Sequence, residues 1–349
     1  MRHLNPLRKS AAIILVLIPL LGQQVWAQIP NIPLPKYQYD SSYIVKFDNL
    51  LALRLVSPRR LYDFTLKNTD SNDKVGYRPN LQSAFGLGVS YRWLAFDVVF
   101  NPKWNRKKTD KYGKTDEFNI KATLYLERHL LDLVYRRYKG MHIINPESYL
   151  DPWDGMIPYR PDMINNNLSI NYTIPFNYKK YSLKTSFLVD GRMKQSAGSF
   201  MYTVAFHLSS MKADSSIIPT EYEYAFDQYA RISTYGFGLL QQAFGYGYTF
   251  IYRKFYLTLS AMPGLSLAVG SVESDGGRYS VSSADFMFAS RNGVGYNSRR
   301  WYTGLYFIYK YQDINLRDDL QLTSNLGEWR FFIGYRIHAP YIVNSIIKN

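Results

Sequence analysis

The chain has 349 residues, of which 46% are hydrophobic and 17% aromatic, and it carries a formal net charge of +15. It has no cysteine, which excludes disulfide frameworks, thiol nucleophiles, thiolate metal sites and a lipoprotein anchor on an N-terminal cysteine. The basic balance suits anionic lipid or polysaccharide surroundings.

The first 27 residues have the features of a secretory signal peptide. Arg2, Arg8 and Lys9 precede an apolar run at residues 11–21, and Val25 and Ala27 are small enough for the positions that a signal peptidase needs. A retained anchor would need roughly 20 apolar residues. We therefore expect export and cleavage after Ala27, and no nucleic-acid partner for the exported chain. Residues 28–42, which contain three prolines, are predicted to form an extended periplasmic leader.

Beyond residue 42, hydrophobic side chains recur at every second position, which is the period of a β-strand. In residues 80–91, large apolar side chains face one way and polar or small ones the other. The same alternation recurs in residues 94–100, 117–127, 168–176, 200–208, 255–269, 301–311 and 329–337. No segment after residue 27 approaches 18 consecutive apolar residues, but a membrane-spanning strand needs only about 9 to 11 residues.

The connections between these predicted strands alternate between short and long. The short ones carry basic residues beside aromatic ones, namely Arg92, Arg128, Lys179, Lys180, Arg253, Lys254, Arg299 and Arg300. Long polar connections are predicted at residues 58–79, 102–116, 139–161, 209–231, 270–278 and 312–325. In outer-membrane barrels, short turns lie at the periplasmic rim and long loops face outside.

The pattern therefore predicts an all-β fold, a transmembrane antiparallel β-barrel of about 12 strands over residues 43–338, followed by a C-terminal tail at residues 339–349. Residues 181–208 are too long for one ordinary strand, which leaves 10 or 14 strands as alternatives. The hydrophobic positions of residues 235–250 change phase, so we expect a bulge near residues 240–243.

Several local runs resemble a known family. Tyr77-Arg78-Pro79-Asn80, Gly86-Leu87-Gly88-Val89-Ser90-Tyr91 and Ser196-Ala197-Gly198-Ser199-Phe200 are similar to a Bacteroidota outer-membrane family described as domain of unknown function 4421. The similarity covers most of the mature chain. The resemblance implies a barrel in the bacterial outer membrane, whose lipids, lipopolysaccharide and barrel-assembly machinery are the expected partners, and it supplies no functional residues.

If the polar strand faces point inward, charged side chains gather in the lumen, because an Arg or Lys facing lipid near the midplane costs about 2–4 kcal/mol. The candidates for a salt-bridge network or a solute path are Lys46, Asp48, Arg54, Asp97, Glu117, Lys121, Glu127, Asp132, Arg136, Lys184, His207, Asp285, Arg291, Lys310, Arg330 and Arg336. Barrels near eight strands are filled and those of 16 to 18 hold open channels, so a filled interior and a path are both compatible with the sequence.

The expected function is a narrow pore or a binding barrel for a small polar or anionic solute. The alternatives are a lipid- or lipopolysaccharide-acting hydrolase and a structural or assembly component of the outer membrane. A hydrolase would use His142 or His207, but no catalytic triad is recognisable around either. We expect no metal and no cofactor, because no His and carboxylate residues have metal-ligand spacing and the paired glycines precede no helix. Inward-facing glycines are expected to make room for large neighbouring side chains.

Overall fold

A computed structural model describes residues 39–47, 49–81, 83–91, 94–100, 106–126, 128–144, 146–148, 155–187 and 191–339. The predicted signal peptide, most of the leader and of the tail, and the candidates Asp48, Arg92 and Glu127 lie outside these residues. The described residues belong to one compact unit.

The structure is built almost entirely from antiparallel strands. They are β1 (Ile44–Lys46), β2 (Leu50–Asn68), β3 (Lys74–Arg78), β4 (Phe85–Tyr91), β5 (Leu94–Phe100), β6 (Asp116–Leu126), β7 (His129–Ile143), β8 (Tyr159–Pro175), β9 (Gly191–Met193), β10 (Ala197–Lys212), β11 (Ile232–Tyr252), β12 (Phe255–Ser274), β13 (Gly277–Asn297), β14 (Trp301–Arg317) and β15 (Leu320–His338). The short helices are α2 (Arg106–Tyr112), η2 (Pro146–Ser148), α3 (Leu183–Phe187) and η3 (Thr220–Ala225). None of the helices in the described residues is long and apolar enough to cross a membrane.

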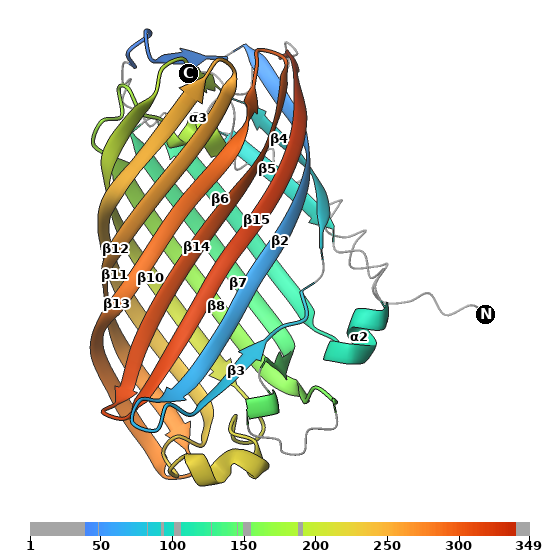
Figure 1. The fold of residues 1–349 in the computed structure, drawn as a ribbon, viewed down its shortest axis with the longest axis vertical. Helices are drawn as coiled ribbons and strands as arrows, with labels where there is room; N and C mark the ends of the chain where they lie inside the picture. The colour runs from blue at the N-terminus through green and yellow to red at the C-terminus, as the bar shows by residue number, and fades with distance from the viewer. Residues whose placement is uncertain are drawn as a thin grey trace, which may run out of the picture. The chain divides into compact units, whose positions relative to one another are not determined.

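The sheet closes on itself to form a barrel (Figure 1). Hydrogen-bonded ladders run from β2 to β15, then through β14, β13, β12, β11, β10 and β8 to β7, and β3 joins β7 back to β2. This ring has ten strands, while β4, β5 and β6 add to the wall beside it. The all-β antiparallel barrel is thus confirmed, and the count of 12 strands is not.

The outside of the barrel changes character along each strand. On β15, the exposed side chains Trp329, Phe331 and Ile333 are apolar, whereas the outward positions Thr323 and Asn325 are polar. The apolar stretch at residues 329–337 has the length expected of one membrane crossing, although β15 has 19 residues. The strands therefore continue well beyond the apolar band.

This extension corrects the predicted long loops. The predicted loops at residues 270–278 and 312–325 are mostly strand, because β12 and β13 are joined only by residues 275–276, and β14 and β15 only by residues 318–319. Much of the predicted loop at residues 58–79 is likewise β2 and β3. Outside the apolar band both the turn and the outer strand face are polar, so the sequence alone does not separate them.

The predicted bulge in β11 is also wrong. The β10–β11 register has no shift, and the β11–β12 register shifts only between Ile232 and Thr234. Tyr235, Phe237 and Leu239 change phase because they face the interior, where they are buried. The barrel interior at this end is apolar rather than polar.

Two apolar clusters occupy the interior, one near each end. At the loop end, Tyr62 and Tyr235 of the wall pack with Ile217 and Tyr222 from the β10–β11 connection. At the end with the short turns, the first part of the long predicted strand at residues 181–208 forms α3 and β9 instead, and β9 pairs with β1. Phe187 of α3 packs there with wall residues including Tyr306 and Phe332.

Candidate functional site

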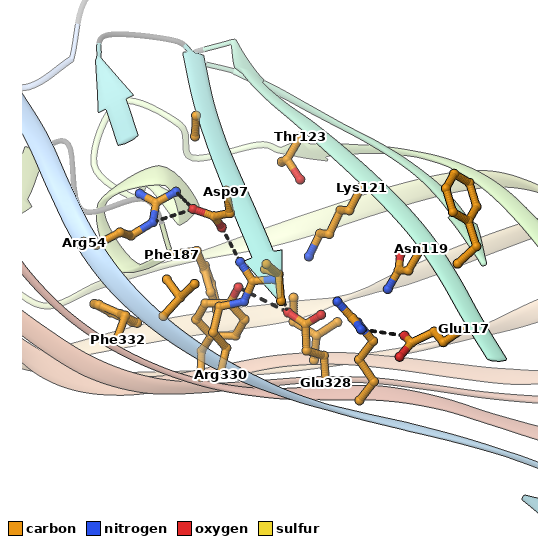
Figure 2. Close-up of a pocket in the computed structure, with 17 residues that line it drawn as sticks. Arg54, Asp97, Glu117, Asn119, Lys121, Thr123, Phe187, Glu328, Arg330 and Phe332 are labelled. Carbon is orange, nitrogen blue, oxygen red and sulfur yellow. Dashed lines mark hydrogen bonds and ion pairs between the residues drawn. The ribbon is translucent and has the colours of Figure 1, made fainter. Parts of the chain in front are cut away.

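A charged chamber lies between the two apolar clusters. Inward residues of β15 show this order, because Leu326 belongs to the loop-end cluster, Glu328 and Arg330 line the chamber, and Phe332 belongs to the short-turn cluster. The chamber has a volume of about 310 Å³, and its charged lining residues are Arg54, Arg60, Asp97, Glu117, Lys121, Glu328 and Arg330 (Figure 2). They come from β2, β5, β6 and β15.

Ion pairs cross the chamber and connect strands that are not neighbours in the sheet. Asp97 of β5 is bound by two arginines, Arg54 of β2 at 2.6 Å and Arg330 of β15. Arg330 also contacts Glu328 at 2.8 Å. All four side chains are largely buried, so their charges are compensated mainly by one another. This network holds β5 against the barrel body.

A glycine makes room for the network. Gly88 of β4 faces inward, and a Cβ atom there would lie 2.1 Å from Asp97 Oδ1 and 2.5 Å from Arg54 Nε. Any side chain at this position would therefore displace the ion pair. The prediction that inward glycines make room for large neighbouring side chains is confirmed at Gly88.

A second, smaller cavity of about 110 Å³ adjoins the chamber, because Lys121, Ile308 and Glu328 line both. Together the two cavities are lined by seven cationic side chains, namely Arg54, Arg60, Lys121, Arg136, Arg291, Lys310 and Arg330. Their four anionic side chains are Asp97, Glu117, Asp132 and Glu328. The lining thus has three more cations than anions.

The excess charge can be assigned to particular residues. Arg60 pairs with Glu117 at 2.5 Å, and Arg291 pairs with Asp132. Lys121, Arg136 and Lys310 make no ion pair and no hydrogen bond with any described residue. The Nε of Arg136 and the Nζ of Lys310 are buried as well. Three basic side chains without an ion-pair partner among the described residues therefore line the smaller cavity.

Residues 38–337 match a domain of unknown function, DUF4421. The chain belongs to the DUF4421 family. A comparison with curated proteins finds no match.

Several solved barrels are similar to this DUF4421 chain. The outer membrane protease OmpT from Escherichia coli has 8% identity and a TM-score of 0.37, covering 83% of this chain and 97% of that one. The translocator domain of autotransporter NalP from Neisseria meningitidis has 8% identity and a TM-score of 0.27, covering 93% and 98%. The attachment invasion locus protein Ail of Yersinia pestis has 13% identity and a TM-score of 0.23, covering 60% and 98%. At these scores none of them indicates a function for the DUF4421 chain.

The DUF4421 barrel brings together only some of the residues predicted from the sequence. Those that line the two cavities are Arg54, Asp97, Glu117, Lys121, Asp132, Arg136, Arg291, Lys310 and Arg330. Asp285 and Arg336 are also buried, but Asp285 bonds Asn315 and Arg336 stacks on Tyr302 near the short turns. Lys46 is exposed on β1, and Lys184 lies on α3 rather than on a wall strand.

The basic residues predicted for the short turns lie outside the strands, apart from Arg92, which is not among the described residues. Arg128, Lys179, Lys180, Arg253, Lys254, Arg299 and Arg300 all lie in connections between strands of the barrel. Two chamber residues, Arg60 and Glu328, are not among those predicted from the sequence. Arg60 lies on β2, where the sequence predicts a loop. The alternation could have identified both residues. Arg60 is an even number of residues from the inward Arg54 on the same strand, and Glu328 is two residues from the inward Arg330.

His207 has a partner that the sequence did not indicate. Its ring Nδ1 lies 2.5 Å from the hydroxyl of Ser169, which lines the smaller cavity. The ring Nε2 is buried and has no hydrogen-bond partner among the described residues. In a Ser-His-Asp triad a carboxylate orients the histidine, and no described carboxylate bonds His207. His142 lies elsewhere, against the ring of Tyr112. The described residues contain no cluster suited to a metal ion.

Proposed function

We propose that this DUF4421 chain is an outer-membrane β-barrel that binds a small anionic solute, or the anionic group of a larger one, in the charged chamber and the smaller cavity that adjoins it. The observation that carries the proposal is the set of three cations without anionic partners, Lys121, Arg136 and Lys310. A buried charge without a partner is strongly destabilising. A bound anion would offset that cost, so the chamber is suited to anions rather than cations.

The membrane location is supported by the outer surface. Exposed apolar side chains surround the barrel at the height of the short turns, and aromatic pairs such as Trp301 with Tyr335 and Phe255 with Tyr296 lie near the turns. Aromatic girdles of this kind occur at both membrane interfaces of outer-membrane barrels. If this surface were in contact with water, the protein would expose a larger apolar patch than soluble proteins usually do.

The interior supports a binding barrel over an open pore. An axial water path would have to cross the loop-end cluster around Tyr62 and Tyr235, and then the short-turn cluster around Phe187. Both clusters consist of closely packed apolar and aromatic side chains. A chamber sealed along the barrel axis is suited to holding a ligand.

Calorimetry with inorganic phosphate and sulfate, on the purified barrel in a zwitterionic detergent, tests the proposal. We expect binding in the wild type and a loss of about tenfold or more in affinity for Lys310→Met, because a hydrogen bond to a charged group contributes about 1.5–3 kcal/mol. Lys67→Met, on the outer face of β2 far from the chamber, is the matched control. Absence of binding in the wild type, or equal affinity in both variants, overturns the proposal.

Planar-bilayer recording distinguishes a closed binding barrel from a narrow pore. A binding barrel gives no conductance steps, whereas steps that Lys310→Met alters would establish the narrow pore instead. If neither conductance nor anion binding is found, the role as a structural or assembly component is favoured.

A second candidate function, hydrolysis of outer-membrane lipid, is favoured by the contact between Ser169 and His207. Release of acyl chains from lipid or lipopolysaccharide should then be abolished in both Ser169→Ala and His207→Ala. His142→Ala serves as the control, because His142 is remote from this pair. Full activity in both dyad variants would remove the candidate.

A further inference from the structure

The wall of the barrel has a seam between β5 and β6. β5 pairs only with β4, and β6 pairs only with β7, so no hydrogen-bonded ladder joins β5 to β6 in the described part of the chain. β3 bridges β2 and β7 near the loop end, where it pairs with residues 64–67 of β2 and residues 142–143 of β7. Toward the short turns, the gap between β2 and β7 is instead filled by β4, β5 and β6 (Figure 1).

The charged chamber reaches the outer surface at this seam. Its lining includes residues 95, 97 and 99 of β5 and residues 117, 119 and 121 of β6, all on inward positions. It also includes Phe118, which points the opposite way and is 52% exposed. A cavity lined from both faces of one strand extends around the edge of that strand. Among the described residues, the lining of the chamber thus extends to the outer face of β6.

The seam lies at the height of the apolar band. Val98 of β5 and Phe118 and Ile120 of β6 are exposed apolar side chains beside it. Strand edges left unpaired in hydrocarbon cost several kcal/mol for each polar group, unless they line a water-filled cavity or meet a polar partner. This seam has an apolar surface outside and a polar chamber behind it, which matches the two halves of an amphiphile.

Beside the carboxylates of Asp97 and Glu117, the chamber presents donor groups that no described residue accepts. Lys121 has no hydrogen-bond or ion-pair partner among the described residues, and the Nε atoms of Arg60 and Arg330 are buried without one. In Figure 2, Lys121 and Asn119 of β6 project into the space that Arg330 and Glu328 reach from β15. The ion pair of Arg60 with Glu117 joins β2 to β6 beside this space. A carboxylate or phosphate accepts hydrogen bonds from all three cations.

We propose that the seam between β5 and β6 is a lateral opening, through which the chamber takes the anionic headgroup of a membrane amphiphile. The headgroup binds Lys121, Arg60 and Arg330, and the acyl chain stays outside, against Phe118 and Ile120. The inference rests on the proposed anion-binding function and adds the ligand class and its route.

Binding of stearate that carries a nitroxide on its acyl chain tests the ligand class. With the full barrel in phosphatidylcholine vesicles, we expect an immobilised component in the electron paramagnetic resonance spectrum that palmitate displaces. Butyrate and inorganic phosphate at the same concentration should displace far less of it, because they reach the same cations without the acyl-chain contacts outside the barrel. Lys121→Met should weaken binding about tenfold or more, and Lys212→Met, an exposed lysine on β10, should not.

The outcomes separate this inference from the function on which it rests. Displacement by phosphate and butyrate as effective as by palmitate would show that the chamber takes anions from water, which overturns the lateral route and leaves the anion site in place. Absence of an immobilised component, with phosphate binding intact in calorimetry, also overturns the inference alone. Absence of both overturns the proposed function.

The route can be tested by blocking the seam. Because the chain has no cysteine, Phe118→Cys introduces a single thiol for a bulky methanethiosulfonate reagent. Phe200→Cys is the matched control, since Phe200 is 54% exposed on the outer face of β10. The label at residue 118 should slow uptake of the spin-labelled stearate at least fivefold, whereas the label at residue 200 should not. Equal rates for the two labelled proteins would refute the lateral route.

Discussion

Replacing Arg330 tests whether the charged network of the chamber stabilises the barrel. The Arg330 side chain is only 9% exposed, and it pairs with both Asp97 and Glu328. In Arg330→Met, Asp97 keeps its contact with Arg54, but Glu328 loses its only ion pair among the described residues. The variant therefore leaves a buried carboxylate without a contacting cation, although Lys121 lines the same chamber.

Removal of one partner from a buried pair costs about 3–5 kcal/mol, mainly because the other charge stays desolvated. We expect a loss of that size in the free energy of unfolding of Arg330→Met. The assay is urea unfolding of the barrel refolded in phosphatidylcholine vesicles, followed by tryptophan fluorescence and by the shift in gel mobility on boiling. Adding Glu328→Gln should recover about 1–3 kcal/mol of the loss, because it removes the orphaned charge.

Arg317→Met provides the matched control. Arg317 pairs with Asp227 at 3.3 Å, but the two side chains are 38% and 46% exposed, and such surface pairs contribute about 0–1 kcal/mol. If Arg330→Met costs no more than Arg317→Met, the network is not a source of stability. If the added Glu328→Gln worsens the loss, the orphaned carboxylate is not its cause.

Two further predictions concern other parts of the chain. Gly88→Ala should cost about 1–3 kcal/mol, because its Cβ would displace the ion pair beside it, whereas Gly238→Ala should lose nothing in the same unfolding assay, since its Cβ meets no atom closer than 3.7 Å. At the loop end, hydrogen bonds from Ser71 and Tyr222 lower the pKa of Asp73. That stabilisation is present above the ordinary carboxyl pKa and is lost as the pH falls through the lowered value. Tyr222→Phe should therefore raise the Asp73 pKa in a carbon-13 NMR titration, and an unchanged value would contradict the hydrogen bond.

Much of the wall follows from alternation in the sequence. Where one face of a strand is apolar and the other lines the interior, the alternation tells which way each side chain points. The sequence therefore predicts that Leu87 and Phe118 face outward and that Arg54 and Asp97 face inward. The basic turns were predicted for the same reason, because charged residues interrupt the apolar alternation where one strand ends and the next begins.

The sequence could not predict the structure beyond the apolar band. There the outer strand faces are polar, so the sequence predicts a loop where Arg60 lies on β2. It also predicts a bulge in β11, because Tyr235 is an apolar side chain on the inward face. The helix α3 arises where residues 183–187 leave the wall and fill the interior. The seam between β5 and β6 depends on which strands pair across the barrel, and no local pattern encodes that choice.

The ladder that closes the barrel joins β2 and β15, the two wall strands that lie farthest apart in the sequence. β2 and β15 have 19 residues each, and every one of them is paired with the other strand. Bringing together chain segments that are ~250 residues apart costs about 5 kcal/mol in loop-closure entropy. A ladder of this length offsets that cost, but one of its two strands is the last wall strand of the chain. During folding, β2 therefore presents an open strand edge until the C-terminal strand arrives, and a chain without β15 would leave β2 and β14 as aggregation-prone edges.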